Sequence, residues 1–181
     1  TERVKFGPLV SPMTFRHPSI LGRMAAQIDE LSNGRFVAGV GAGWNVPEHT
    51  AFGIPFPPLR ERMDRLEESI RVMKALWSEG QANFTGRYYH LQDTECYPKP
   101  VQNPLPIMVG GMGERRTLKI VAELADEWNS LGVMIDDYKR KTEVLEGHCA
   151  AVDRNPSEIK HSQTSGFIVG KDDQGIRRHL V

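Results

Sequence analysis

The clearest indication of the fold is the stretch Gly34-Arg35-Phe36-Val37-Ala38-Gly39-Val40-Gly41-Ala42-Gly43-Trp44-Asn45. Its apolar run, residues 35–40, lies between an Asn33-Gly34 turn signal and a cluster of glycines, which predicts a buried strand. A dinucleotide-binding turn needs the pattern GxGxxG, but Trp44 stands where the third glycine belongs. The stretch therefore predicts a strand with a glycine-rich end and argues against a Rossmann site.

Four further apolar runs of strand length bring the number of predicted strands to five. They span residues 4–10, 105–109, 127–133 and 164–169. Helical segments lie between them, and strand–helix alternation is typical of a parallel sheet with crossover helices. The fold class predicted for the whole chain is therefore α/β.

The helices are predicted from apolar side chains at steps of three and four residues. These side chains are Ile20, Met24, Ile28 and Leu31 in the first helix, and Leu59, Met63, Leu66, Ile70, Met73 and Trp77 in the longest one. Weaker patterns predict helices over residues 114–125 and 136–152. In the longest helix, Leu66 and Ile70 are expected to face the sheet, whereas Glu68 falls on another face and is expected to contribute little to stability.

Composition excludes several classes of protein. The 181 residues contain 23 Lys and Arg against 23 Asp and Glu, so no bulk charge attracts nucleic acid or an anionic membrane. No apolar run approaches the ~20 residues that span a bilayer, and a cytoplasmic location is the default expectation. Cys96 and Cys149 have neither a CxxC neighbour nor a histidine at ligand spacing, and Gly-Lys-Ser/Thr is missing. No disulfide, metal site or Walker A loop is therefore expected.

Glycines cluster after two of the predicted strands, at residues 39–43 and 110–113. Glycine lets the backbone approach a ligand closely, and barrel enzymes keep their sites at the carboxyl ends of strands. Glu114-Arg115-Arg116-Thr117 follows the second cluster and begins a predicted helix, whose free N–H groups favour an anion such as a phosphate. The alternative is a tight turn with two solvated arginines. Residues 47–58 and 80–104 are Pro-rich connections, expected to run over a functional face.

Several motifs together resemble the bacterial luciferase-like flavin oxidoreductases, and most closely the branch that uses the deazaflavin coenzyme F420. They are residues 11–18 (SPMTFRHP), 34–45 (GRFVAGVGAGWN), 86–89 (GRYY), 98–102 (PKPVQ), 109–113 (VGGMG) and 125–129 (ADEWN). The similarity covers roughly residues 5–169.

The resemblance implies a (β/α)8 TIM barrel, but such barrels usually need about 250 residues. We therefore expect a partial barrel with about five of the eight βα units. By resemblance, residues 1–181 form a single luciferase-like barrel domain that lacks the first two strands and the last. Open strand edges are a liability. The alternative to an enzyme is thus a non-catalytic barrel remnant, or a subunit that needs a partner to complete the fold.

The resemblance also implies an oxidoreductase that acts on a small organic substrate. The cofactor is deazaflavin F420, which favours hydride transfer, or FMN, which would permit oxygen-dependent monooxygenation. No nucleic acid, membrane or metal is implied, and a homo-oligomer is compatible with the resemblance. The catalytic residues and the substrate are not identified.

Cofactor-binding residues are implied in four places. A cis peptide is expected at Leu9-Val10 behind the flavin ring, followed by Ser11, which bonds the ring or caps the turn. The remaining residues implied at the cofactor are Gly41, Gly43, Asn45, Gly110, Gly111, Met112, Gly113 and Asn129. Trp128 is expected in the core and His17 in a structural role. Glu48 and His49 form either a proton-transfer pair or part of an exposed excursion, and neither is assigned to catalysis.

Overall fold

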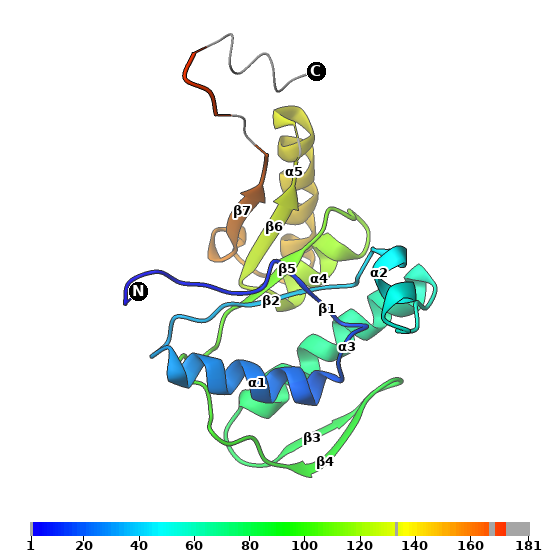
Figure 1. Cartoon of the computed structure of the whole chain (residues 1–181), viewed down its shortest axis with the longest axis vertical. Coiled ribbons are helices and arrows are strands. Elements are labelled where there is room, and N and C mark those ends of the chain that lie inside the picture. Colours follow the sequence, from blue (N-terminus) through cyan, green and yellow to red (C-terminus); the bar gives the residue numbers. More distant parts are fainter. Residues whose placement is uncertain (1, 133, 167–168, 173–181) are drawn as a thin grey trace.

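The computed structural model describes residues 2–132, 134–166 and 169–172 and contains a five-stranded sheet (Figure 1). The strand order is β1-β2-β5-β6-β7, and all four pairs are parallel. The strands are β1 (Ser11–Pro12), β2 (Ala38–Gly41), β5 (Ile107–Gly110), β6 (Glu127–Leu131) and β7 (Lys160–Thr164). The parallel α/β architecture predicted from the sequence is confirmed.

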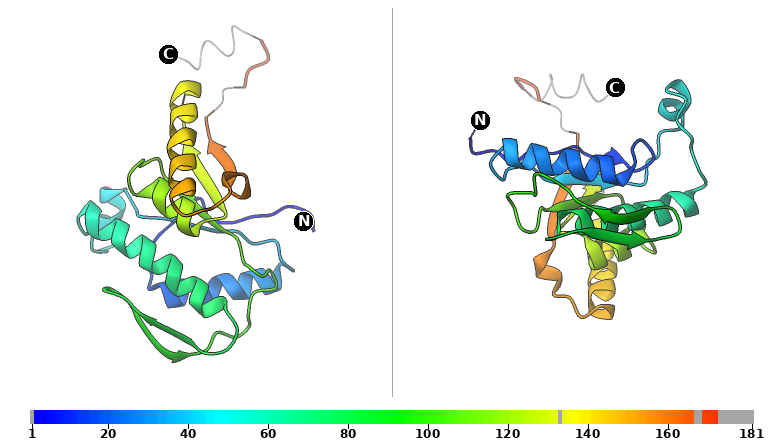
Figure 2. Two further views of the ribbon diagram at one scale, coloured as in Figure 1. Left: turned by 180° about the vertical axis from the view of Figure 1, so that it is seen from behind. Right: turned by 90° about the horizontal axis from the view of Figure 1, so that it is seen from below.

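Helices connect consecutive strands of this sheet. They are α1 (Pro18–Leu31), α2 (Val46–Ala51), α3 (Leu59–Trp77), α4 (Thr117–Leu124) and α5 (Ile135–Ala151), with a short 3-10 helix at Pro156–Glu158. Helix α1 contacts α3, α3 contacts α4, and α4 contacts α5, in the same order as the strands they join (Figure 2). This is the strand-and-helix arrangement of a (β/α)8 barrel, of which the described residues supply five parallel strands. The expected single domain lacking three strands stays a prediction.

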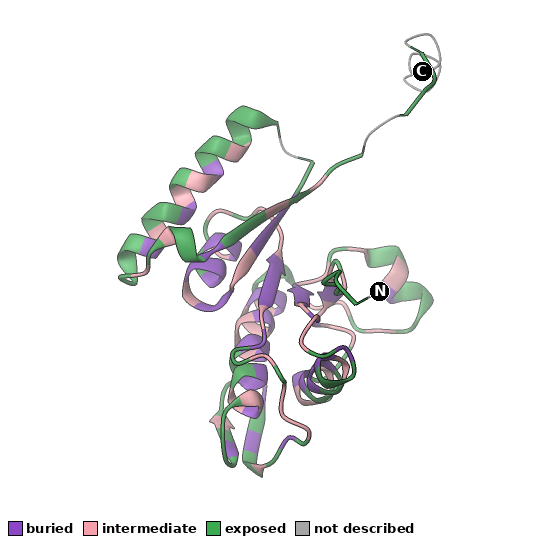
Figure 3. Cartoon of the chain, turned by 90° about the vertical axis from the view of Figure 1, so that its left-hand side faces the viewer, coloured by how far each residue is buried: buried purple, intermediate pink, exposed green. Residues whose placement is uncertain are grey.

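The core lies between the sheet and the helices, where buried residues of both layers meet (Figure 3). Leu66 and Ile70 of α3 are almost completely buried there, as their spacing predicts. Val40 and Val109 supply apolar side chains from the neighbouring strands β2 and β5. Because these strands run parallel beneath helices, their side chains on that face are apolar.

Helix α1 has the predicted position but not the predicted buried face. Met24 is 39% exposed and Leu31 is 87% exposed, although both belong to the apolar pattern. The buried residues of α1 include Gly22, Ala25 and Ala26. A Cβ on Gly22 would lie 3.2 Å from Leu76 of α3, so small residues are what allow α1 to approach α3 closely.

The predicted outer strands are shifted. Residues 4–10 make only an isolated bridge, between Phe6 and Phe36, before β1 begins at Ser11. Gly7-Pro8 interrupts the run, and proline offers no N–H to a ladder. The strand predicted at residues 164–169 instead ends at Thr164, and its polar sequence, Lys160–Thr164, gives no apolar signal. Residue 133, expected to end β6, and residues 167–168 lie outside the described part.

A hairpin occupies part of the Pro-rich connection at residues 80–104, which was expected to run over a functional face. Strands β3 (Ala82–Thr85) and β4 (His90–Thr94) pair antiparallel beside α3. The Glu68 carboxylate accepts hydrogen bonds from the backbone N–H groups of Arg87, Tyr88 and Tyr89, at 2.8, 2.9 and 3.2 Å. Glu68 therefore anchors the hairpin to α3, and the prediction that it contributes little to stability is wrong.

Two further findings bear on the class of protein. None of the helices within the described residues has both the length and the apolar character required to cross a membrane. The same residues contain no cluster of three or more His, Cys, Asp or Glu side chains suited to a metal ion.

Candidate functional site

A cavity of about 1110 Å³ opens at the carboxyl-terminal ends of the strands. Its lining consists of Leu9, Val10, Pro12, residues 41–44, Glu48, Leu59, Arg60, Met63, Gly110, Gly111, residues 113–117, Asn129, Leu131 and Thr164. Ligand sites in proteins reach about 1,000 Å³, so the cavity is large enough for a cofactor. A second cavity of about 460 Å³ opens beside the strand starts, among Val37, Pro106 and Lys160. Barrel enzymes work at the carboxyl ends, so the larger cavity is the candidate.

The floor of the cavity is formed by Val10 and two glycines. The peptide bond between Leu9 and Val10 is cis, as the resemblance predicted. A Cβ on Gly41 would lie 2.7 Å from a γ carbon of Val10, and a Cβ on Gly110 would lie 2.9 Å from the other. Neither position has room for a side chain. Glycines on neighbouring strands thus leave a smooth apolar surface beneath Val10.

Residues 110–113, here the β5 loop, have their carbonyl groups held by donors outside the cavity. The Trp128 indole N–H donates to the Gly111 carbonyl at 2.8 Å, and the Lys141 ammonium donates to the Met112 carbonyl at 3.0 Å. The Leu118 N–H donates to the Gly113 carbonyl at 3.0 Å. Carbonyl oxygens that would repel an anion are therefore occupied by these donors.

Helix α4 begins at Thr117, after a turn that follows this loop, and no side chain caps its amino end. The first N–H groups of a helix lack intrahelical partners, and together with the helix dipole they attract an anion. Of these groups the Leu118 N–H already donates to the Gly113 carbonyl, whereas the Thr117 N–H has no partner recorded within the described residues. A Cβ on Gly113 would lie 3.0 Å from the Thr117 hydroxyl oxygen, and Gly111 has φ of +137°. Both positions therefore require glycine, which keeps the backbone accessible from the cavity.

The charged groups on the cavity wall differ in whether they are already paired. Arg116 bonds Asp64 at 2.7 Å and lies 3.6 Å from Glu67, whereas Arg60 and Arg115 have no ion pair recorded within the described residues. The Lys141 ammonium, 3.1 Å away, and the Arg140 guanidinium hold the pKa of the Glu114 carboxyl below its ordinary value. Glu48 of the wall likewise has no ion pair recorded within these residues, so the unpaired charges on the wall are two arginines against one carboxylate.

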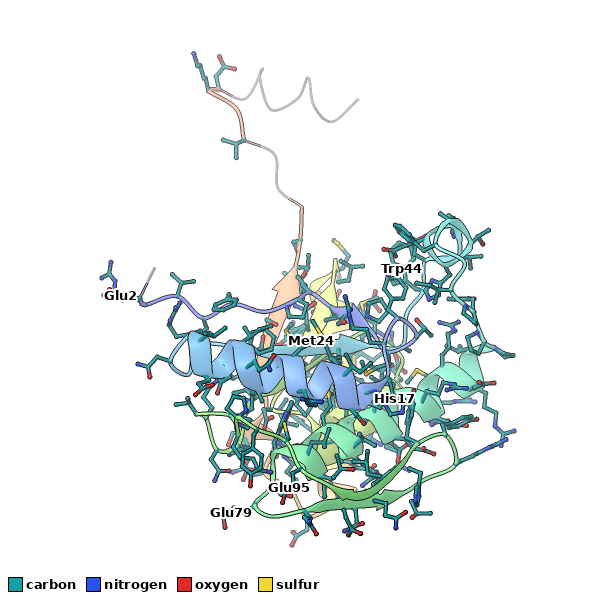
Figure 4. All side chains as sticks on the ribbon, turned by 60° about the horizontal axis from the view of Figure 1, so that its bottom comes forward. Glu2, His17, Met24, Trp44, Glu79 and Glu95 are labelled. Atoms are coloured by element: carbon teal, nitrogen blue, oxygen red, sulfur yellow. The ribbon has the colours of Figure 1, made fainter. Side chains whose placement is uncertain are left out.

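The segment after β2, residues 42–48, is here called the rim loop. Gly43 has φ of +80°, and the Trp44 side chain stands 80% exposed between β2 and α2 (Figure 4). Asn45 caps α2, because its side-chain oxygen accepts the Glu48 N–H at 3.3 Å. The next residue, His49, is 1% exposed, so it is not part of an exposed excursion. Glu48 lines the cavity while His49 lies behind it.

The structure brings most of the predicted cofactor residues to one cavity. Those on its wall are Leu9, Val10, Gly41, Gly43, Gly110, Gly111, Gly113 and Asn129. Three others lie elsewhere: Ser11 accepts a bond from Arg16, Asn45 caps α2, and the Met112 carbonyl faces Lys141.

Asn129 keeps hydrogen-bonding capacity toward the cavity. Its side-chain nitrogen donates to the Ser162 hydroxyl at 3.0 Å, and its oxygen accepts from the Thr164 hydroxyl at 3.3 Å. An amide NH₂ has two donors, so one hydrogen remains. Trp128, the preceding residue, is completely buried, and its placement in the core is confirmed.

Sequence reasoning missed the wall that α3 contributes. Leu59, Arg60 and Met63 lie on the first turns of this helix and line the cavity. A helix that follows a barrel strand begins near the carboxyl end of that strand. This rule could have placed the start of α3 at the cavity, since α3 follows β2 through the rim loop and α2.

This arrangement is that of a partial α/β barrel with a cofactor-sized, glycine-lined cavity at the carboxyl ends of its strands. Residues 1–181 match the model of the family described as luciferase-like monooxygenase. The chain belongs to this family, whose members are flavin- or F420-dependent oxidoreductases and monooxygenases.

Relatives of the chain use both types of cofactor. It is 41% identical over 114 residues to the F420-dependent glucose-6-phosphate dehydrogenase of Kineococcus radiotolerans, covering 62% of this chain and 33% of that protein. It is 27% identical over 181 residues to the FMNH(2)-dependent dimethylsulfone monooxygenase of Pseudomonas putida, covering 100% of this chain and 48% of that protein. The chain thus spans a third to a half of the length of these relatives.

Solved structures show the same fold. An F420-dependent secondary alcohol dehydrogenase in complex with an F420-acetone adduct superimposes with a TM-score of 0.81 at 25% identity. The match covers 90% of this chain and 49% of that one. The structural relatives are TIM barrels, so the partial barrel predicted from the sequence is confirmed.

Proposed function

We propose that the cavity binds a flavin-type cofactor and that the protein is an oxidoreductase using deazaflavin F420 for hydride transfer to or from a small organic substrate. The observation that carries this proposal is the β5 loop. Its carbonyl groups are held by Trp128, Lys141 and Leu118, while the Thr117 N–H at the start of α4 and the Arg115 side chain are left for a phosphate. A site of this kind suits the phosphate of a nucleotide-like cofactor.

The residues present fit a flat ring as well as a phosphate. Val10, Gly41 and Gly110 form an apolar surface without projecting side chains, on which a planar ring system can lie. Asn129 has an amide hydrogen available for a polar edge of the ring. When bound, the cofactor supplies the two-electron chemistry, and the protein supplies binding and orientation.

F420 is favoured over FMN by the relative with the higher identity, the dehydrogenase of Kineococcus radiotolerans. FMN-dependent monooxygenation is the second candidate, because the monooxygenase of Pseudomonas putida aligns over the entire chain. The cavity wall described above suits either cofactor, since both carry a tricyclic ring and a phosphate.

Anaerobic titration of the purified chain with F420 and with FMN, followed by absorbance and fluorescence, tests the proposal. We expect saturable binding of both, tighter for F420, and weaker binding when inorganic phosphate competes for the β5 loop. Tighter binding of FMN would favour the monooxygenase. Binding of neither by a chain that melts cooperatively would refute the proposal, and phosphate without effect would refute the assignment of the β5 loop.

A further inference from the structure

Behind the rim loop lies a buried polar group that does not itself line the cavity. His49 of α2 is 1% exposed, and both of its ring nitrogens are engaged. Nδ1 lies 2.7 Å from the Asn45 carbonyl oxygen, and Nε2 lies 2.7 Å from the Thr14 hydroxyl. A carbonyl oxygen only accepts, so Nδ1 carries the hydrogen, and in the neutral ring the Thr14 hydroxyl donates to Nε2.

The imidazole is also held between two aromatic rings. Phe15 and Phe56 contact it edge to face, with ring centroids 4.9 and 4.7 Å away. Phe15 belongs to the turn after β1, and Phe56 belongs to the segment before α3. His49 therefore joins α2 to the turn after β1, which is distant in the sequence, and to the segment that connects α2 with α3.

This cluster touches the cavity wall through Gly43. A Cβ on Gly43 would lie 3.1 Å from the Thr14 hydroxyl oxygen and 3.5 Å from Cε1 of His49. From the other side the buried Arg62 guanidinium, which stacks on Phe56 at 4.0 Å, donates to the Gly43 carbonyl. Gly43 is thus fixed between His49 and Arg62.

The rim loop supplies four residues of the cavity wall, namely Ala42, Gly43, Trp44 and Glu48. The backbone that bears Trp44 and Glu48 has few other contacts, since the Trp44 side chain is largely exposed and the Asn45 side chain bonds only within α2. We propose that His49 is a positioning residue, which fixes the rim loop through Thr14, Phe15 and Phe56 and so holds this wall against the cofactor. The inference rests on the proposed function for its consequence, but the ordering of the loop can be measured without a cofactor.

The test compares His49→Phe, which keeps a ring and loses both hydrogen bonds, with His49→Gln, whose amide can still reach Thr14. Tyr138→Phe is the matched control, because it removes a hydrogen bond of 2.7 Å to His161 in another aromatic cluster. Hydrogen exchange of residues 42–48 in the free chain is read alongside the melting temperature and the dissociation constants of FMN and F420.

We expect amide exchange in residues 42–48 to accelerate at least about tenfold in His49→Phe, with a similar loss of cofactor affinity, because both hydrogen bonds of the ring are lost. His49→Gln should recover most of both. Tyr138→Phe should lower the melting temperature without changing the amide exchange of residues 42–48 or the cofactor affinity. Thr14→Val is the milder variant if His49→Phe does not fold.

Two results would overturn the inference. One is unchanged exchange in residues 42–48 despite a lower melting temperature, and the other is an equal rise of exchange throughout the chain. If the parent binds neither FMN nor F420, the proposed function fails, and the exchange data still decide the role of His49.

Discussion

The two glycine-rich loops at the cavity, residues 41–43 and 110–113, are held in place by different means. The first is fixed by side chains behind it, His49 on one side and Arg62 on the other. The second is fixed by its own carbonyl groups, which accept from Trp128, Lys141 and Leu118. Similar sequences thus serve different ends. The first loop leads to Trp44 and Glu48, which line the cavity. The second is proposed to hold a phosphate through backbone N–H groups, of which that of Gly111 already donates to the Asn129 carbonyl.

The largest effect is expected from Gly111→Val, in the second loop. A branched side chain is strained at φ of +137° and would meet Thr117 at 3.2 Å, which is expected to cost about 1–3 kcal/mol of stability. Affinity for F420 or FMN should fall about 100-fold, because the backbone N–H groups no longer reach the phosphate. Fluorescence titration gives the affinity, and a melting curve gives the stability.

The control for that variant is Gly147→Ala, in α5, where nothing lies within 4 Å of the added carbon. It should bind normally and be as stable as the parent or slightly more so. Parent-like binding by Gly111→Val, or a loss merely proportional to unfolding, would show that these glycines only make a turn.

Gly43→Ala tests the first loop and should act mainly on stability. Its φ of +80° and the Thr14 hydroxyl 3.1 Å from the new Cβ together predict a loss of about 1–2 kcal/mol, measured by urea unfolding. Gly53→Ala has a similar φ, +64°, with no atom within 4 Å, and isolates the backbone contribution. Equal losses of stability in the two variants would mean that contacts with Thr14 and His49 do not disfavour a side chain at position 43.

A smaller effect is expected from Arg115→Gln, which removes an exposed, unpaired charge beside the β5 loop. Cofactor affinity should weaken about three- to tenfold at low salt. The difference from the parent should shrink as salt is added, because exposed charges are screened. Arg87→Gln, an equal change of charge on the distant hairpin, should bind like the parent. Salt-independent loss in Arg115→Gln would point to a packing effect instead of charge.

The smallest effect concerns pH and touches only the second loop. Lys141, and after it Arg140, hold the pKa of Glu114 below its ordinary value. A lowered folded-state pKa contributes stability above the unfolded pKa, about 4.3, and the contribution disappears as pH falls through the folded value. The melting temperature of Glu114→Gln should therefore lie slightly below that of the parent at pH 7 and meet it in acid. A constant difference down to pH 3 would contradict this.

Helices α1 and α3 show how far periodicity alone can lead. In α3 the apolar positions Leu66, Ile70 and Met73 are the buried ones. In α1 the buried positions are small residues and Asp29, whose carboxylate accepts from the backbone and side chain of Gln102 at 2.9 and 2.7 Å. Periodicity gives the helix, but a close helix contact selects small side chains that no hydrophobic pattern marks.

The candidate site shows the same division. Gly41, Gly110, Gly111 and Gly113 could be predicted as cavity residues, because glycine at a strand end has a local reason and parallel strands end together. Asn45 could not be excluded from the cavity, since an asparagine after a strand is equally suited to cap the next helix. Arg60 and Met63 of α3 reach the cavity only through the path of the chain over residues 46–58.

Sequence patterns alone predict the parallel α/β order and the long helix α3. They also predict the glycines at the ends of two strands that meet at the cavity. Three other features depend on the tertiary fold. Glu68 holds a hairpin, His49 is buried behind Gly43, and Trp128 and Lys141 donate hydrogen bonds to carbonyl groups of the β5 loop. The reason is physical. Local conformation depends on near neighbours along the chain, whereas the burial and partners of a polar group depend on residues that folding brings from far away.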